Sequence, residues 1–266
     1  MEIAGHVVVV TGAGQGLGAA LAEVAADRGA AGVVVADLDL DHATSVAERI
    51  GGYAVHADVS TPSGIDTIIE RARERYGRID LYISNAGIGS RSSVFASDED
   101  WTRHWNIHVM AHVWAARALL PEMIQRGHGG LVNVASSVAL SSQPEMAGYN
   151  ATKHAALAVA ETLAIDHHDQ GVYIGCACPQ GMRTPMLLGQ LHGAPPELAA
   201  FGLANAIEPL DAATRIVDGI EAGRFLILTH DEVQTYAQRR AADHDRWLGG
   251  MRRMYQHLAT TTDDRP

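Results

Sequence analysis

The sequence predicts a single α/β domain in which a doubly wound parallel sheet of about seven strands is flanked by helices. Short apolar runs rich in β-branched residues alternate with longer amphipathic stretches along the whole chain. This alternation is typical of repeated βαβ units. Several of the short runs are apolar on both faces, as expected of strands that are covered by helices on both sides.

The expected elements follow one another without a break in composition. Strands are predicted over residues 6–10, 32–37, 53–58, 79–85, 129–136, 172–178 and 225–229. Helical patterns occupy residues 16–29, 40–50, 62–76, 98–127, 148–169 and 210–223. The chain shows no internal repeat or linker, so we expect residues 1–266 to form one domain.

Two segments depart from the alternation. Residues 186–209 combine prolines and glycines with short apolar clusters. This combination is typical of a mobile lid that covers a bound substrate. Residues 230–258 mix charges with spaced Trp, Met and Tyr. This pattern favours one C-terminal amphipathic helix that extends the domain.

Charge and composition exclude several classes of protein. The formal net charge of −11 at pH 7 argues against nucleic acid or an anionic membrane as a partner. No apolar run reaches the roughly 18 residues of a membrane span. The start of the sequence lacks the basic segment that is typical of a signal peptide. Cys176 and Cys178 lie two residues apart on an expected strand, a poor geometry for a disulfide. We therefore expect core thiols in a cytoplasmic protein.

The segment TGAGQGLG, residues 11–18, separates the first expected strand from the first helix. A helix N-terminus offers unpaired N–H groups and the positive end of the helix dipole. We assign the tight turn to Gly12, the approach of a pyrophosphate to Gly16 and close contact between helix and strand to Gly18. The segment therefore predicts a dinucleotide site, although its spacing differs from the general G-x-G-x-x-G pattern.

A carboxylate at the end of the second strand indicates which dinucleotide binds. Asp37 follows the glycines by about 20 residues and is able to accept both hydroxyls of an adenine ribose, whereas it would repel a 2′-phosphate. Asp58 is expected to meet the adenine edge. Alternatively, Asp37 caps the following helix together with Asp39 and Asp41. The position directly after the strand favours the ribose and hence NAD.

Tyr149 and Lys153 are four residues apart on an expected helix, so they share one face. A tyrosine with a pKa of about 10 is a poor base at neutral pH. A nearby ammonium group favours the phenolate and lowers that pKa. Tyr149 is then able to exchange a proton with an alcohol or ketone oxygen. Alternatively, the two residues form an ordinary surface pair, because Y-x-x-x-K is frequent by chance.

Taken in order, these motifs resemble the short-chain dehydrogenase/reductase family in its single-domain form, over about residues 5–229. The remaining motifs are the pair Asp58–Val59, NAG at 85–87, Asn106, Ser136, YNATK at 149–153 and PQGMRTPM at 179–186. The resemblance implies a Rossmann-like fold, a nicotinamide cofactor and redox chemistry between carbonyl and alcohol. It also implies the site residues.

By this resemblance the catalytic set is Asn106, Ser136, Tyr149 and Lys153. Asn106 would hold a relay water, Ser136 rather than Ser137 the substrate oxygen, and Lys153 the nicotinamide ribose. The cofactor is expected to contact Gly12, Gln15, Gly16, Leu17, Gly18, Asp37, Leu38, Asp58, Val59, Asn85, Ala86, Gly87, Tyr149, Lys153, Pro179, Met182 and Thr184.

One position departs from the family pattern. Gln180 stands where the family usually has the glycine of a Pro-Gly pair. We expect its side chain at the nicotinamide or at the substrate, so the substrate contacts are Ser136, Tyr149 and Gln180. The Leu, Met and Ala residues of the expected lid favour an apolar or cyclic alcohol or ketone.

Three histidines on one expected helix raise the question of a metal site. His104, His108 and His112 form one stripe on the expected helix, and such spacing is able to bind zinc. No glutamate completes an H-E-x-x-H motif, so we expect a packing role and no metal.

The helices at 98–127 and 148–169 carry apolar residues on more than one face, which predicts a homodimer or, by the resemblance, a homotetramer.

The sequence therefore predicts a NAD-dependent secondary-alcohol dehydrogenase or ketone reductase. One alternative is an isomerase, dehydratase or epimerase that retains the cofactor. Another is a non-catalytic dinucleotide sensor, which the complete set Asn106, Ser136, Tyr149 and Lys153 disfavours.

Overall fold

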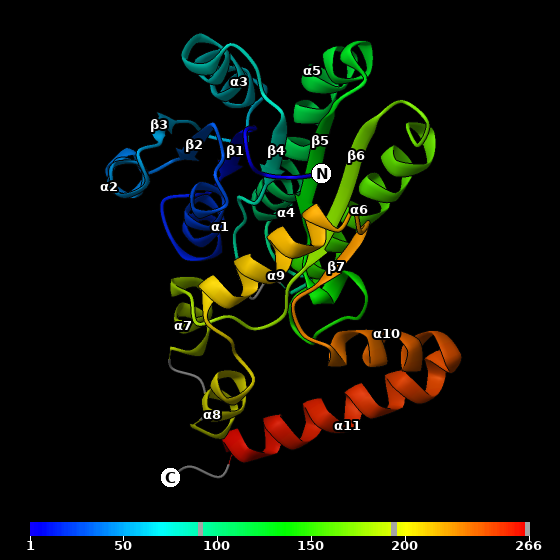
Figure 1. Ribbon diagram of the computed structural model, residues 1–266. Helices are drawn as coiled ribbons and strands as arrows, with labels where there is room; N and C mark the ends of the chain where they lie inside the picture. Colours follow the sequence, from blue (N-terminus) through cyan, green and yellow to red (C-terminus); the bar gives the residue numbers. More distant parts are fainter. Residues whose placement is uncertain (90–92, 193–195, 264–266) are drawn as a thin grey trace.

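Seven parallel strands form one sheet in the order β3-β2-β1-β4-β5-β6-β7 (Figure 1). The computed structural model describes residues 1–89, 93–192 and 196–263. The strands are β1 (Val7–Thr11), β2 (Gly32–Asp37), β3 (Tyr53–His56), β4 (Leu81–Ser84), β5 (Gly129–Val134), β6 (Val172–Cys178) and β7 (Leu226–Leu228). The order reverses between β1 and β4, which confirms the doubly wound sheet and puts a crevice at their carboxyl ends.

Helices cover both faces of this sheet (Figure 1). One face packs against α1 (Gly16–Asp27), α2 (Leu40–Ile50) and α9 (Pro209–Glu221). The other packs against α3 (Pro62–Tyr76), α5 (Ala111–Arg126) and α6 (Ala147–Asp166). No helix over the described ranges combines the length and the apolar character that a membrane span requires.

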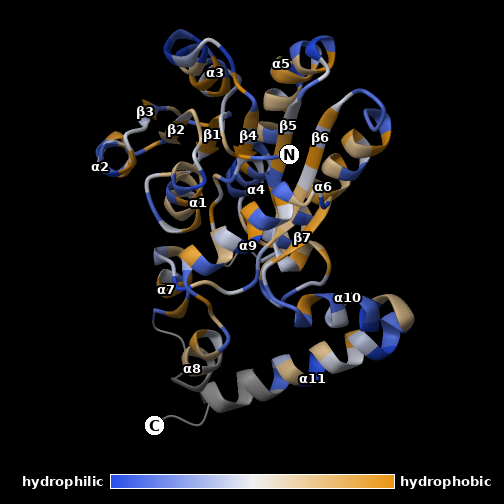
Figure 2. Cartoon of the chain, in the orientation of Figure 1, coloured by the Kyte–Doolittle hydropathy of each residue, from blue (hydrophilic) through white to orange (hydrophobic). Residues whose placement is uncertain are grey.

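The run VVVV at the start of β1 shows why the strands are apolar throughout. Val8 and Val10 pack with Leu21 of α1 on one side of the sheet. Val9 packs on the opposite side with Ile68 of α3. Successive side chains of a strand point to opposite faces, so a strand between two helical layers needs apolar residues at every position. Figure 2 shows these apolar strands in the interior of the molecule.

The helix expected over 98–127 is not uniform. It consists of α4 (Asp98–Trp105), a five-residue π-helical segment (Asn106–Met110) and α5. In that segment the Ala111 N–H donates to the carbonyl of Asn106, five residues back. Such π turns are rare and frequently occur at functional sites.

The segments after β6 hold two further pairs of helices. Within the expected lid lie α7 (Pro185–Leu191) and α8 (Pro196–Ala204), and residues 193–195 of that lid fall outside the described residues. The prediction of a single C-terminal helix is wrong, because the structure has α10 (Glu232–Ala242) and α11 (His244–Asp263). Asp243 between them is extended, and its carboxylate accepts a hydrogen bond from the Arg246 N–H at 2.9 Å. The side chain thus starts a new helix instead of continuing the first.

A buried carboxylate anchors the amino-terminal edge of the sheet. Asp80 is 1% exposed and precedes β4. Its carboxylate accepts hydrogen bonds from the Val7 N–H at 2.9 Å and from Arg78 at 3.0 Å, and Arg126 lies 3.7 Å away. Burial alone raises the pKa of Asp80, but the Val7 bond and the two arginines outweigh burial and hold the pKa below its usual value.

We expect Asp80→Asn to lower the free energy of unfolding at pH 7 by about 2 kcal/mol, because the neutral amide replaces a hydrogen-bonded charge. The contribution of the carboxylate is complete above its unfolded pKa of about 3.9 and is lost as the pH falls through the lower folded pKa. In urea unfolding, the difference in the free energy of unfolding between the unmodified protein and the variant should therefore become smaller below about pH 4. Asp66→Asn, at an exposed position of α3, is the control. An equal difference at pH 7 and in acid would contradict the role of the charge.

Candidate active site

A cleft of about 350 Å³ lies over the carboxyl ends of the strands, at the reversal between β1 and β4. Its walls are the turns that follow the strands, together with residues of α4, the π-helical segment and α6. All residues that the sequence predicts as cofactor contacts line it: Gly12, Gln15, Gly16, Leu17, Gly18, Asp37, Leu38, Asp58, Val59, Asn85, Ala86, Gly87, Tyr149, Lys153, Pro179, Met182 and Thr184. The structure thus brings together residues that are far apart in the sequence.

The floor of the cleft is bare backbone. Gly12 has a φ of +62°, and a Cβ there would lie 2.7 Å from the Cα of Ala86. A Cβ on Gly18 would lie 2.0 Å from the carbonyl oxygen of Gly12. No larger residue fits either place without moving the backbone, so the first turn of α1 approaches β1 as closely as the glycine pattern predicts.

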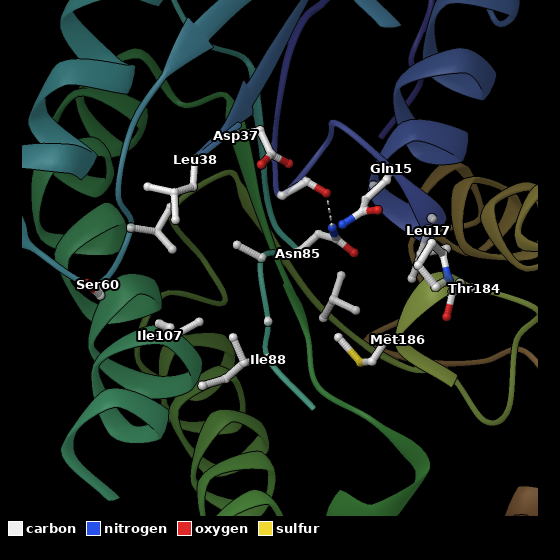
Figure 3. Close-up of a pocket in the computed structure, with 18 of the residues that line it drawn as sticks. Gln15, Leu17, Asp37, Leu38, Ser60, Asn85, Ile88, Ile107, Thr184 and Met186 are labelled. Atoms are coloured by element: carbon white, nitrogen blue, oxygen red, sulfur yellow. Dashed lines mark hydrogen bonds between the residues drawn. The ribbon is translucent and has the colours of Figure 1, made fainter. Parts of the chain in front are cut away.

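The turn after β4 is joined to this floor. The Thr11 hydroxyl oxygen accepts hydrogen bonds from the N–H groups of Asn85 and Ala86, both at 3.0 Å. The Asn85 amide donates to the carbonyls of Thr11 at 2.8 Å and Gly12 at 3.2 Å. In Figure 3, Asn85 lies between Asp37 at one end of the cleft and Thr184 at the other. Asn85 therefore fixes the middle of the cleft.

Asp37 faces the cleft and does not cap α2. One carboxylate oxygen accepts from the Gly14 N–H at 2.8 Å and the other from the Asp39 N–H at 3.0 Å. The cap of α2 is Asp39, whose carboxylate accepts from the His42 N–H at 3.1 Å. The alternative of a capping role for Asp37 is therefore wrong. Its carboxylate is held in one orientation with lone pairs left for a ligand.

The opposite end of the cleft holds Tyr149 and Lys153, one turn apart on α6. The Lys153 ammonium group donates to the carbonyl of Val134 at 2.9 Å and lies 5.7 Å from the centre of the Tyr149 ring. The Ser136 hydroxyl forms a hydrogen bond with the Tyr149 side chain. Its oxygen also accepts from the Val138 N–H at 3.3 Å.

Burial shifts both titratable groups at this end toward their neutral forms. Burial raises the pKa of Tyr149, and the hydrogen bond with Ser136 opposes that rise only in part. Burial lowers the pKa of Lys153 to about 8. The sequence predicts a lowered Tyr149 pKa, whereas the pKa is raised, because burial is the largest influence on the phenol and the Lys153 ammonium group is hydrogen-bonded to Val134.

Three predicted residues are not among the described residues that line the cleft. Asn106 opens the π-helical segment and lines a neighbouring cavity together with Ser60 and Arg103. Ser136 reaches the cleft through its bond to Tyr149. The backbone N–H of Gln180 donates to the Thr229 hydroxyl oxygen at 3.3 Å, and the role of the Gln180 side chain at the nicotinamide or the substrate stays a prediction.

The cleft also has walls that sequence reasoning missed. Arg103 and Ile107 line it from α4 and the π-helical segment, and their spacing of four was the available signal. Ile88 and Met186 line it near Tyr149, and Figure 3 shows both side chains beside the segment that follows Asn85. A Cβ on Gly89 would lie 2.8 Å from Met186, so α7 packs tightly against this segment.

The histidine stripe lies inside the molecule. The rings of His104, His108 and His112 are buried. The described residues hold no group of three or more His, Cys, Asp and Glu placed to bind a metal ion. Cys176 and Cys178 are buried free thiols, as the sequence predicts.

The residues of the cleft fit a nicotinamide dinucleotide. The floor is a backbone cradle that a Cβ at Gly12 or Gly18 would fill, and it ends at the N-terminus of α1, where phosphates bind readily. A carboxylate with open lone pairs stands at one end, and a phenol with an ammonium group at the other. A dinucleotide carries hydroxyls, phosphates and a redox ring in the matching order.

Known proteins share these features. The family model of the short chain dehydrogenase matches residues 6–192. The oxidoreductase UcpA of Escherichia coli K12 is 31% identical over 88% of this chain and 91% of its own length. Meso-2,3-butanediol dehydrogenase of Serratia marcescens is 32% identical over 80% of this chain and 86% of its own.

A solved structure agrees with the fold. It is a short chain dehydrogenase/reductase from Burkholderia phymatum in complex with NAD, with a TM-score of 0.83 and 28% identity over 92% of this chain and 96% of that one. With the family model covering most of the described cleft, the chain belongs to the short-chain dehydrogenase/reductase family of oxidoreductases.

Proposed function

We propose that the chain is a NAD-dependent oxidoreductase that interconverts a secondary alcohol and a ketone. The carrying observation is the meeting of Tyr149, Lys153 and Ser136 at the end of the cleft opposite Asp37. The bound nicotinamide ring supplies the hydride acceptor or donor. The proton has to be moved by the protein.

Tyr149 is the proposed acid and base. In reduction its phenol gives a proton to the ketone oxygen, and in oxidation its phenolate takes the proton of the alcohol. The Val138 N–H donates to the Ser136 oxygen and orients the hydroxyl, and we propose that the Ser136 proton shared with Tyr149 is donated to the substrate oxygen when substrate binds. A tyrosine of ordinary pKa is already a neutral phenol at neutral pH, and burial raises the Tyr149 pKa further, so the phenol is present to protonate a ketone oxygen. Asn106 and Lys153 complete the proposed proton relay.

Asp37 supports NAD over NADP. Both its oxygens are fixed by backbone N–H groups, so the carboxylate is not free to turn away from a 2′-phosphate. Gln15 and Leu38 line the same cleft, and both are uncharged. The cations among the described lining residues are Lys153 at the catalytic end and Arg103 on α4. A like charge at close range disfavours NADP by several kcal/mol unless a cation intervenes.

The walls near Tyr149 support an apolar substrate. Ile88, Pro185 and Met186 are among the apolar residues that line the cleft. One relative is a butanediol dehydrogenase, and butanediol is a small secondary alcohol. An isomerase, dehydratase or epimerase of the same fold would return its cofactor unchanged. A net change of NADH absorbance with a secondary alcohol distinguishes the oxidoreductase from that class and from a non-catalytic sensor.

An assembly of identical subunits fits the outer surface of the two long helices. Trp105 of α4 is 45% exposed and Ile165 of α6 is 77% exposed. Ala158 on α6 is exposed as well. Large apolar side chains on neighbouring elements indicate a contact surface. We therefore propose a homodimer or homotetramer built on these helices.

Tyr149→Phe should reduce turnover by roughly 10²–10⁴-fold and leave the dissociation constant of NADH nearly unchanged, because only the transferable proton is removed. Lys153→Ala should weaken both turnover and NADH binding. Initial rates with a panel of secondary alcohols and NADH fluorescence titrations measure the two effects. Tyr236→Phe, at an exposed position of α10, is the control. Near-normal turnover of Tyr149→Phe would show that the proposed mechanism is wrong.

The unmodified enzyme should favour NAD over NADP by at least about 100-fold in kcat/KM, equivalent to roughly 2.7 kcal/mol. The double substitution Asp37→Ser with Leu38→Arg should narrow or reverse this ratio, because it removes the repelling charge and adds a cation. Asp39→Ser is the matched control, since that carboxylate caps α2. An NADP rate equal to that with NAD in the unmodified enzyme would refute the role of Asp37.

Light scattering at micromolar concentration should give two or four times the 28.3 kDa mass of one chain. Ile165→Glu should shift the distribution toward smaller particles, because it places a charge in the proposed contact. Leu210→Glu, at an exposed position of α9, is the matched control. A single 28.3 kDa species of the unmodified protein excludes the assembly.

A further inference from the structure

We infer that His108 is a positioning residue that connects the turn after β4, which lines the cofactor cleft, to the catalytic helix α6. The inference rests on the proposed function, because it assigns His108 to the support of Tyr149 and Lys153. His108 lies in the π-helical segment, and its ring is buried completely. Both ring nitrogens are engaged, and each contacts a different side of the site.

The contacts set the direction of the hydrogen bonds. The Ile88 N–H donates to Nε2 of His108 at 3.0 Å. A backbone N–H is only a donor, so Nε2 is the acceptor and the ring proton sits on Nδ1. Nδ1 lies 2.9 Å from the Thr152 hydroxyl oxygen, which in turn donates to the Gly148 carbonyl at 2.8 Å. One chain of bonds therefore runs from the Ile88 N–H to the first turn of α6.

The ring also contacts the catalytic groups themselves. It stands edge-on to the Tyr149 ring, with centroids 5.4 Å apart and an interplanar angle of 90°. Thr152 directly precedes Lys153. A Cβ on Gly87 would lie 3.4 Å from Nε2 of His108 and 3.7 Å from the Lys153 ammonium nitrogen. His108 of the π-helical segment and Lys153 of α6 thus both lie close to the backbone of Gly87, in the turn after β4.

Only the neutral ring is able to make these contacts, because protonation of Nε2 would remove the acceptor of the Ile88 N–H. The groups that face the ring are Tyr149 and Lys153 of α6, His104 of α4 and His112 of α5. Burial, and next the charge of Lys153, lower the pKa of His108 well below the usual histidine value. The same tautomer therefore persists through the neutral range.

Two substitutions separate the two contacts. In His108→Asn the amide lies near the position of Nδ1, so the bond to Thr152 is retained and the acceptor for Ile88 is lost. In His108→Gln the longer side chain reaches the position of Nε2, so the acceptor is retained and the bond to Thr152 is lost. We expect His108→Asn to raise the NADH dissociation constant about tenfold and to leave kcat within about threefold. We expect His108→Gln to lower kcat about tenfold and to leave the NADH dissociation constant within about threefold.

His112→Gln is the matched control. This histidine lies one turn further along the stripe, is equally buried, and its ring nitrogens have no hydrogen-bond partner among the described residues. It should change the NADH dissociation constant and kcat by less than about threefold each. Thermal unfolding of all three variants corrects for loss of folded protein.

Hydrogen exchange gives a readout that needs no turnover. His108→Asn should speed exchange in the segment 85–89, and His108→Gln in the segment 147–153. If Tyr149→Phe stays active, the proposed chemistry fails, but this exchange pattern still tests the connection through His108. Equal effects of both variants on binding, turnover and exchange, or effects no larger than those of His112→Gln, would overturn the positioning role.

Discussion

The cleft depends on how closely the first turn of α1 approaches the end of β1. The space that a Cβ of Gly18 would need is occupied by the carbonyl oxygen of Gly12. That contact brings the helix N-terminus over the sheet, and the Thr11 hydroxyl and the Asn85 amide then join the β4 turn to it. Asp37, the glycine turn and the NAG turn acquire their mutual positions from this one approach of two backbones.

At the catalytic end, burial is the dominant influence. It raises the Tyr149 pKa and lowers the Lys153 pKa to about 8, so the preference for the charged form is weaker in both groups than in water. A site of this kind is suited to passing a proton and poorly suited to holding a fixed charge. At the other end, Asp37 is oriented by backbone donors, which leaves its lone pairs available for recognition. Burial therefore governs the catalytic end, and backbone hydrogen bonds govern the end at Asp37.

The parts of the site that the sequence predicted are those with local signatures. The glycine turn, Asp37 and the pair Tyr149–Lys153 are each recognisable within one element, and the structure brings them to one cleft. Arg103 and Ile107 were missed because their place depends on how α4 packs against α6. The break at Asp243 was missed because residues on both sides of it have the same mixture of charged and apolar side chains.

The contacts of His108 could not be predicted from the sequence for the same reason. A histidine stripe with a spacing of four predicts one helix face and gives no indication of what that face meets. Only the fold shows that His108 reaches backwards to Ile88 and forwards to Thr152. The Tyr149 pKa also follows from the packing around it, which no spacing of residues reveals.

The π turn at Asn106 makes the position of α4 depend on how the helix is wound. One residue of a regular α-helix turns the chain by about 100°. The wider turn between Asn106 and Ala111 takes up one residue more than a regular turn. Regular winding of the same residues would therefore rotate α4 by about one residue relative to α5. Arg103 would then leave the cleft, while Tyr149 and Lys153 stayed in place.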